Sequence, residues 1–227
     1  MQGFFRMIRK YFLFLSKVAS RKNLYNNIIK SIAIIKKKKK NKILNIGSGG
    51  DIEELLKKNF KIIYSIDIDK KRNPDQVIDI CDKKFKNKIN FRPDVISIFE
   101  VLEHTKDPHL ALKNIYSLLK KGDYCLASVP FNFHIHDEPN DYFRFTYYGI
   151  SLLFNNFSDI KIIKRNGWLE SIFVNFIRLE KERNIFSKIV GKFFLIIYFI
   201  FYPLIQLLQK IITSDKITTG YYIQAIK

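Results

Sequence analysis

Cysteine and histidine are scarce in this 227-residue chain. Two cysteines, Cys81 and Cys125, are too few for a disulfide framework or a cysteine-rich zinc site. The four histidines lie between His104 and His136, so histidine chemistry is confined to that stretch, and no metal site is predicted. Apolar residues nevertheless make up 47% of the chain, which excludes global disorder and suits one domain with an appendage.

Acidic residues are absent from the first 50 positions, which hold 13 of the 40 Lys and Arg. A general drift in amino-acid composition explains a Lys-rich chain, but it does not explain why acidic residues are missing only from the first 50 positions. Residues 4–15 mix bulky apolar side chains with cations, as interfacial helices do, and the apolar run 11–15 is too short for a signal peptide. The segment favours an anionic membrane surface. An amphipathic helix packed on the domain is the alternative.

Apolar strand patterns alternate with helical patterns through the middle of the chain. The lysine run 36–40 is predicted to be a solvated turn before the first strand, and residues 22–35 are predicted to be helical. Alternation of this kind predicts a parallel sheet with helices on both faces. The expected strands are 42–46, 61–66, 76–80, 94–99, 124–129, 160–164 and 221–226.

An uncharged run of 17 residues, 193–209, separates the last two expected strands. It is shorter than the roughly 20 residues of a spanning helix, and Pro203 kinks or breaks a helix there. If both flanking strands join one sheet, both ends of the insertion lie on the same side of the membrane, and a single crossing is excluded. A monotopic or re-entrant hairpin and a helical pair packed on protein both stay open, and the basic N-terminus favours the membrane.

A strand at 42–46 leads into Gly47-Ser48-Gly49-Gly50 and then a helix. Glycines let a backbone approach a ligand, and a helix N-terminus offers free N–H donors. Asp67 lies 20 residues after Gly47, at the end of the next strand, where a carboxylate can accept both hydroxyls of a ribose. Ile52 breaks the glycine fingerprint of dinucleotide-binding proteins, and no P-loop follows.

Five motifs over residues 40–165 resemble those of class I S-adenosylmethionine-dependent methyltransferases. The motifs are 44–50, 65–69, 78–80, 99–108 and 118–123. The resemblance implies a doubly wound, Rossmann-like α/β fold. Its seven-stranded sheet is mostly parallel, with an antiparallel last strand and an apolar helical insertion before that strand. From the residues themselves we predict basic amphipathic helices at 1–36, followed by the methyltransferase domain at 37–227 with the apolar helical insertion at about 168–212.

The resemblance implies that S-adenosyl-L-methionine is the cofactor. Asn45 stands where the family has an acid, and Asp51 stands where it has a third glycine. The residues that the resemblance assigns to cofactor binding are Asn45, Gly47, Ser48, Gly49, Asp67, Ile68, Asp79, Ile80, Glu100 and His104.

Residues 129–146 are similar to a signature of methyltransferase type 11 proteins found in bacterial surface-polysaccharide and lipopolysaccharide biosynthesis. This implies O-methylation of a sugar or of a small or lipid-linked glycan acceptor. His136 is the first candidate for general base and His104 the second, since histidine has a suitable pKa. Asp141 is predicted to orient the base or a hydroxyl, and Arg144 to hold an anionic part of the acceptor. An Asp141–Arg144 ion pair that only stabilises the loop is the alternative.

Three rival functions are weighed against this one. A lipid or quinone methyltransferase is expected to have a more apolar active site than the polar residues 136–144 provide. A nucleic-acid methyltransferase lacks its Asn/Asp-Pro-Pro-aromatic motif here, so no nucleic acid is expected. A non-catalytic, membrane-associated scaffold keeps the fold without binding the cofactor. The expected location is the cytoplasm, peripheral or monotopic at the cytoplasmic membrane.

Overall fold

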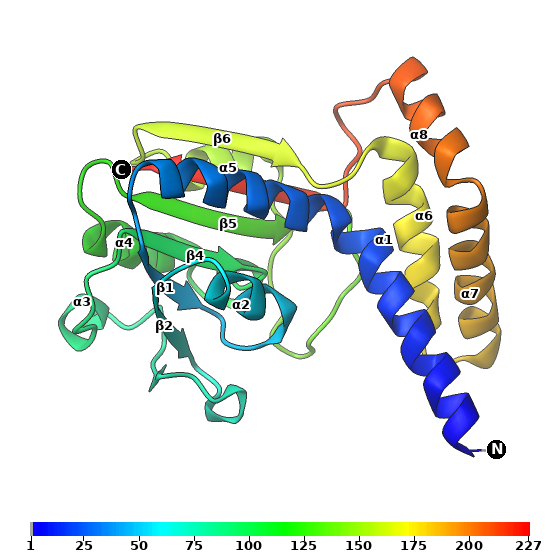
Figure 1. Cartoon of the computed structure of the whole chain (residues 1–227), viewed down its shortest axis with the longest axis horizontal. Coiled ribbons are helices and arrows are strands. Elements are labelled where there is room, and N and C mark those ends of the chain that lie inside the picture. The colour runs from blue at the N-terminus through cyan, green and yellow to red at the C-terminus, as the bar shows by residue number, and fades with distance from the viewer. Residues whose placement is uncertain (1) are drawn as a thin grey trace. The chain divides into compact units, whose positions relative to one another are not determined.

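The computed structural model describes residues 2–227, with side chains from Lys10 onward, so the cationic side chains Arg6 and Arg9 lie outside the described ones. The chain divides into two compact units, and helix α1 (Gln2–Lys37) contributes to both (Figure 1). The sheet unit comprises Tyr25–Phe131, Ile135–Ile163 and Tyr221–Lys227. The helical unit comprises the residues up to Leu24, Asn132–His134 and Lys164–Gly220.

The sheet unit carries seven strands with helices flanking them (Figure 1). The strands are β1 (Lys42–Ile46), β2 (Ile62–Asp67), β3 (Gln76–Val77), β4 (Val95–Phe99), β5 (Tyr124–Pro130), β6 (Asp159–Lys164) and β7 (Gly220–Ile226). Its helices besides α1 are α2 (Gly50–Lys57), α3 (Phe85–Lys88), α4 (Pro108–Leu118) and α5 (Tyr147–Leu153), and its short 3₁₀ turns are η1 (Lys70–Arg72) and η2 (Leu102–His104).

The strand order is β3-β2-β1-β4-β5-β7-β6. Strand β1 pairs in parallel with β2 and β4, so Ile46 lies opposite Ile66 on one side and Ile98 on the other. Strand β7 lies between β5 and β6 and is antiparallel, and the Ser158 amide donates to the Ile226 carbonyl at 2.8 Å. The predicted Rossmann-like α/β fold is confirmed. The carboxyl ends of β1, β2 and β4 meet at one edge of this sheet, which is where open parallel sheets bind ligands.

Strands β4 and β5 are buried along their whole length, as expected for a sheet covered on both faces. The second half of α1 contributes Ile28, Ile32 and Ile35 to the buried residues, at helical spacing. The Ser31 hydroxyl of the same helix accepts from Tyr222 at 2.7 Å and donates to Gln224 at 2.6 Å. Apolar burial and hydrogen bonds therefore both fix this part of α1 on β7.

Two local expectations need correction. The third strand ends at Val77 instead of residue 80, because the chain turns there and the Asp79 carboxylate accepts from the Cys81 amide at 2.8 Å. The N-terminal segment forms one continuous helix, α1, and not separate helices. The predicted division of the chain at residue 37, with an insertion at about 168–212, stays a prediction.

Asp123, at the turn before β5, binds the last residue of the lysine run, Lys40, while the other four lysines of that run are exposed as predicted. Its buried carboxylate pairs with Lys40 at 2.5 Å and Arg92 at 2.6 Å, and accepts from the Lys120 amide at 2.7 Å. Burial raises the pKa of Asp123, but these donors outweigh burial and hold the pKa below its usual value. The last lysine of the run is thus an ion-pair partner of a buried acid.

The helical unit contains α6 (Trp168–Arg178), the short turn η3 (Leu179–Lys181), α7 (Ile185–Ile200) and α8 (Tyr202–Ile211), besides the first part of α1. Its small core is formed by Ala19, Ile177, Leu195, Tyr198 and Ile205. Among the described residues, no single helix is long and apolar enough to cross a membrane. Helices α7 and α8 together are long and apolar enough, but the chain bends by 74° between them.

Candidate functional site

The loop after β1 follows a backbone path that favours glycine. Gly47 and Gly49 have φ values of 92° and 89°, which L side chains rarely adopt. A Cβ atom on Gly47 would lie 2.6 Å from a methyl group of Val101, in the segment after β4. No atom lies within 4 Å of a Cβ atom built on Gly49. The loop is therefore packed against the protein at its first glycine and open at Gly49, where a ligand can approach.

Asp67, the last residue of β2, is joined directly to this loop. Its carboxylate accepts from the Ser48 amide at 2.8 Å and from the Asp69 amide at 2.8 Å, and Arg72 Nε lies 3.8 Å away. A carboxylate has about four acceptor positions, so it retains capacity for hydroxyl groups of a ligand. The two features, 20 residues apart in the sequence, thus lie side by side at the carboxyl edge of the sheet.

Glu53, on the first turn of α2, holds the loop from beneath and was not predicted from the sequence. Its Oε2 accepts from the Ser48 hydroxyl at 3.0 Å and from the Gly49 amide, and its Oε1 pairs with Lys57 at 2.5 Å. Burial raises the pKa of Glu53, yet the Gly49 amide and Lys57 outweigh burial and lower the pKa overall. The sequence did show an acid in the first turn of this helix. Because the helix dipole is enough to explain an acid at that place, the sequence did not indicate a role for Glu53.

Asn45, on β1, is hydrogen-bonded both to the glycine loop and to the neighbouring strand β4. It is buried, its amide donates to the Gly47 carbonyl at 3.1 Å, and its Oδ1 accepts from Ser97 on β4 at 2.8 Å. These bonds tie the loop to the two central strands. A role in positioning the loop follows directly, whereas contact of Asn45 with a cofactor stays a prediction.

The residues after β2 and β3 differ in their exposure. Ile68 is 69% exposed beside Asp67 and offers an apolar surface to a flat ligand. Asp79 is exposed, although one carboxylate oxygen accepts from the Cys81 amide. Ile80 is buried in the core, and its carbonyl accepts from Asn114 at 2.7 Å. Ile68 and Asp79 are therefore accessible to a ligand, and the Ile80 side chain is not.

Glu100 follows β4 in an unusual backbone conformation. Its φ is 54°, which is strained for a residue other than glycine, and such strained residues are enriched at functional sites. The strain is sustained because the Glu100 amide donates to the Ser128 carbonyl at 3.0 Å and its carboxylate accepts from the Ser128 hydroxyl at 2.7 Å. These bonds direct the chain from β4 into the turn that carries Glu103 and His104.

His104 and His136 lie against one another, with ring centroids 4.9 Å apart, although 32 positions separate them in the chain. His104 follows β4 and His136 follows β5. Their Nε2 atoms lie 3.9 Å and 3.8 Å from the same oxygen of Glu103. Glu103 is fully buried, and burial together with the nearby Glu100 carboxylate raises its pKa, despite the opposing effect of the histidines. The sequence motif contained Glu103, but nothing in it assigned that residue a role.

Asp141 and Arg144 form a bidentate ion pair, with both N–O distances 2.6 Å. The Asp141 carboxylate also accepts from the His136 amide at 2.8 Å and lies 3.3 Å from His136 Nδ1. Burial raises the pKa of Asp141, but Arg144 and His136 outweigh it and lower the pKa to about 2. Asp141 thus orients His136, and Arg144 supports Asp141. Direct contact of Arg144 with an anionic acceptor stays a prediction.

Comparisons with known proteins identify the family and the fold. The profile of a family described as methyltransferase domain matches residues 19–168, which is more than half of the chain. No curated protein matches. Among solved structures, the chain is similar to a SAM dependent methyltransferase from Archaeoglobus fulgidus, with 19% identity and a TM-score of 0.59, over 96% of this chain and 99% of that one.

Two further solved structures show the same fold. The plantazolicin methyltransferase BpumL, in complex with SAH, has 14% identity and a TM-score of 0.54, over 98% of this chain and 89% of that one. Phosphoethanolamine N-methyltransferase 2 from Haemonchus contortus, in complex with S-adenosyl-L-methionine, has 18% identity and a TM-score of 0.50. The alignment covers 92% of this chain but only 56% of the Haemonchus protein.

Proposed function

Since the chain belongs to the methyltransferase domain family, we propose that it transfers a methyl group to a hydroxyl of a sugar or glycan-type acceptor at a membrane surface. The chain is an S-adenosylmethionine-dependent methyltransferase, and that cofactor supplies a methyl group on a sulfonium for in-line displacement. The acceptor class and the membrane are the proposed part. The proposed acceptor class is supported by the pair of histidines, His104 and His136, and the proposed membrane by the apolar surface of the helical unit.

The crevice at β1 and β2 fits the cofactor. Open space over Gly49 admits a ligand close to the backbone. The Asp67 carboxylate lies 2.8 Å from the Ser48 amide, in position to accept the two hydroxyls of a ribose. The exposed Ile68 side chain, next to Asp67, provides an apolar contact for an adenine ring. These three residues would hold the adenosine part of the cofactor.

The pair of histidines is the observation that carries the choice of acceptor. The Nδ1 atom of His104 lies 2.7 Å from the Asn140 carbonyl, which can only accept, so Nδ1 carries the proton and Nε2 has a free lone pair. Asp141, beside Nδ1 of His136, favours the same tautomer for that ring. His136 can therefore take a proton from an acceptor hydroxyl, and Asp141 and Glu103 stabilise the resulting imidazolium.

Residues 137–142 supply polar groups suited to a glycan. The Asp137 carboxylate is 70% exposed, and Tyr142 is exposed with its hydroxyl on Asn140 at 2.7 Å. Carboxylate, amide and phenol groups of this kind can hydrogen-bond sugar hydroxyls. This polar character supports a sugar acceptor over a quinone or a lipid chain.

The acceptor class is tested by incubating the protein with radiolabelled S-adenosylmethionine and polyprenyl diphosphate-linked glycans, free sugar nucleotides, phospholipids or quinones. We expect label in the glycan fraction. The H136Q variant should lower turnover by roughly 10²-fold or more, the usual contribution of a general base. The H109Q variant is the control, since His109 is exposed on α4. Label only in phospholipid or quinone, or full turnover by H136Q, would refute the proposal.

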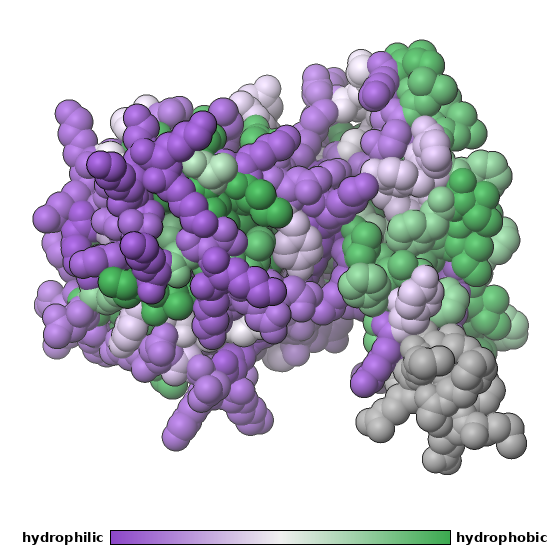
Figure 2. Space-filling model, viewed as in Figure 1, coloured by the Kyte–Doolittle hydropathy of each residue, from purple (hydrophilic) through white to green (hydrophobic). Residues whose placement is uncertain are grey.

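The helical unit exposes an extended apolar surface. On α7 the exposed residues Ile189, Phe193, Ile196 and Ile200 follow one another at helical spacing. Exposed Leu204, Leu207 and Ile211 on α8 follow the same spacing. Figure 2 shows hydrophobic residues gathered over α7 and α8, whereas the visible face of the sheet unit is mainly hydrophilic. Soluble proteins seldom expose patches of this extent without an interaction partner.

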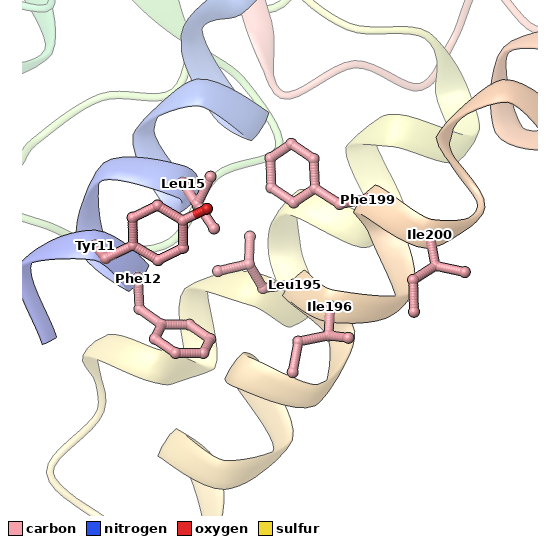
Figure 3. A pocket seen from close by; sticks show the side chains of 7 residues that line it. All are labelled: Tyr11, Phe12, Leu15, Leu195, Ile196, Phe199 and Ile200. Atoms are coloured by element: carbon pink, nitrogen blue, oxygen red, sulfur yellow. The ribbon is translucent and has the colours of Figure 1, made fainter. Parts of the chain in front are cut away.

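The charges around this surface favour an anionic bilayer as its partner. Helices α7 and α8 contain no acidic residue, and their charged residues are Lys188, Lys192 and Lys210. An apolar face edged by cations matches the boundary between headgroups and acyl chains of anionic lipid. A groove of about 370 Å³ in the same unit is lined by side chains of α1 and α7 that face one another, and it suits an acyl chain (Figure 3). Its lining residues are Tyr11, Phe12, Leu15, Leu195, Ile196, Phe199 and Ile200.

Vesicle flotation tests the membrane proposal. We expect the protein to float with phosphatidylglycerol vesicles, and to bind phosphatidylcholine vesicles at least tenfold more weakly. The double variant I196E/I200E should lose flotation, while I62E, a matched change at an exposed isoleucine of β2, should keep it. Flotation of I196E/I200E at the wild-type level, or a stable dimer that buries this face instead, would contradict the proposal.

A further inference from the structure

Three potential metal-ligand atoms converge at the ends of β4 and β5. One carboxylate oxygen of Glu103 and one ring nitrogen each of His104 and His136 all lie within 4.8 Å of one another. The two Nε2 atoms lie 3.9 Å and 3.8 Å from Glu103 Oε1. Ligands about 2.1 Å from a tetrahedral zinc ion are about 3.4 Å apart. The two distances to Glu103 exceed this spacing by about 0.5 Å, and the two histidine nitrogens, within 4.8 Å of one another, have to approach by at most about 1.4 Å.

Glu103 provides an independent indication of a missing ligand. It is fully buried, and neither of its carboxylate oxygens has a hydrogen-bond partner among the described residues. An acid buried without a partner is costly, and native proteins rarely retain one without a compensating group. The two histidine Nε2 atoms, 3.9 Å and 3.8 Å from Glu103 Oε1, lie too far for hydrogen bonds. A cation bound by the three side chains would compensate the buried carboxylate of Glu103.

Both histidines are held as metal-binding histidines usually are. The Nδ1 atom of His104 lies 2.7 Å from the Asn140 carbonyl, and Nδ1 of His136 lies 3.3 Å from the Asp141 carboxylate. These contacts place the proton on Nδ1 and direct the Nε2 lone pair to the ion. Asp141 is itself fixed by Arg144 through two bonds of 2.6 Å. The supporting groups around the three ligands are therefore already in place.

We propose that Glu103, His104 and His136 bind a divalent first-row transition-metal ion, such as Zn²⁺ or Mn²⁺. Two imidazoles and one carboxylate suit these ions, whereas Mg²⁺ and Ca²⁺ prefer oxygen ligands. The exposed carboxylate of Asp137, 4.0 Å from His104 Nε2, lies at the edge of the site. Three protein ligands leave a position open for water or an acceptor oxygen, as in catalytic zinc sites. With the ion bound, the Nε2 lone pair of His136 is engaged, so the ion would take over the role proposed for His136: an acceptor hydroxyl bound at the open position would be acidified and lose its proton to water.

The test uses the untagged 227-residue chain after treatment with chelator and gel filtration. Co²⁺ is titrated and its visible absorption recorded, and bound Zn²⁺ and Mn²⁺ are measured by equilibrium dialysis with elemental analysis. We expect one ion per chain. The E103Q and H104Q variants should weaken Co²⁺ binding at least tenfold, while H109Q should bind like the wild type. Circular dichroism and S-adenosylmethionine binding establish that each variant is folded.

Three results would overturn the metal proposal: no binding of Co²⁺, Zn²⁺ or Mn²⁺ at 0.1 mM, binding that E103Q and H104Q both retain, or binding that H109Q loses equally. Ion binding is measured without acceptor or cofactor, so its outcome is independent of the proposed function. Methyl transfer to glycan by protein that binds no ion would leave the function standing and remove the metal. Binding of one ion per chain without methyl transfer to any glycan would support the metal site and refute the proposed glycan acceptor.

Discussion

Replacing Glu53 by Gln tests whether the acid beneath the glycine loop sets its geometry. The change keeps the shape of the side chain and removes its charge. In the wild type, Oε2 accepts from the Ser48 hydroxyl and the Gly49 amide, and Oε1 pairs with Lys57. Hydrogen bonds to a charged acceptor are stronger than neutral ones by about 1 kcal/mol each, and a partly exposed ion pair adds about 0.5 kcal/mol. We therefore expect a loss of about 2.5 kcal/mol.

For a chain of this size the loss corresponds to a fall in Tm of about 5–10 °C. Thermal unfolding followed by circular dichroism measures the fall, and calorimetry should show S-adenosylmethionine binding at least tenfold weaker, because the loop amides are no longer fixed. Glu54→Gln is the matched control, since Glu54 is the exposed neighbour on the same helix. If E53Q melts with the wild type and binds the cofactor equally well, the reasoning about the loop is wrong.

Two further predictions concern the backbone and a buried acid. Gly47→Ala should lower the free energy of unfolding by about 2–4 kcal/mol in urea titrations, since the unfavourable φ and the contact with Val101 add together, whereas Gly49→Ala should cost only about 1–2 kcal/mol. Equal losses would contradict this. Asp123→Asn should cost about 2 kcal/mol at pH 7, because the lowered pKa means that the ionised carboxylate stabilises the fold. That difference should shrink as the pH falls below about 4 and through the folded-state pKa of Asp123, and a difference independent of pH would refute it.

The local pattern of the sequence was enough to predict the sheet and the cofactor crevice. The strand before Gly47 and the strand ending at Asp67 are short apolar runs next to turn residues, and in a parallel sheet their carboxyl ends must meet at one edge. The glycine loop and Ile68 could be assigned to the same edge of the sheet, because they directly follow these two strands. The end of β3 was predicted three residues too late, because Ile78 and Ile80 are buried without belonging to a strand.

Contacts between distant positions were not predictable. Lys40 pairs with Asp123, 83 positions later, and one sequence gives no sign that they meet. Glu103 likewise appeared only as part of a motif, and its significance depends on the approach of His136 from the segment after β5. Amphipathic patterns show which face of a helix is apolar, but not what covers it, and α7 is an example.

The central claim is that Asp67 and the adjoining glycine loop bind S-adenosylmethionine. Isothermal titration of the cofactor into the wild type, Asp67→Ala and Asp69→Ala tests it most directly, since Asp69 is an exposed acid two positions away. We predict one cofactor per chain for the wild type, binding at least tenfold weaker for D67A, and wild-type binding for D69A. Equal affinity of D67A and the wild type, or no binding by the wild type at millimolar cofactor, would contradict the claim.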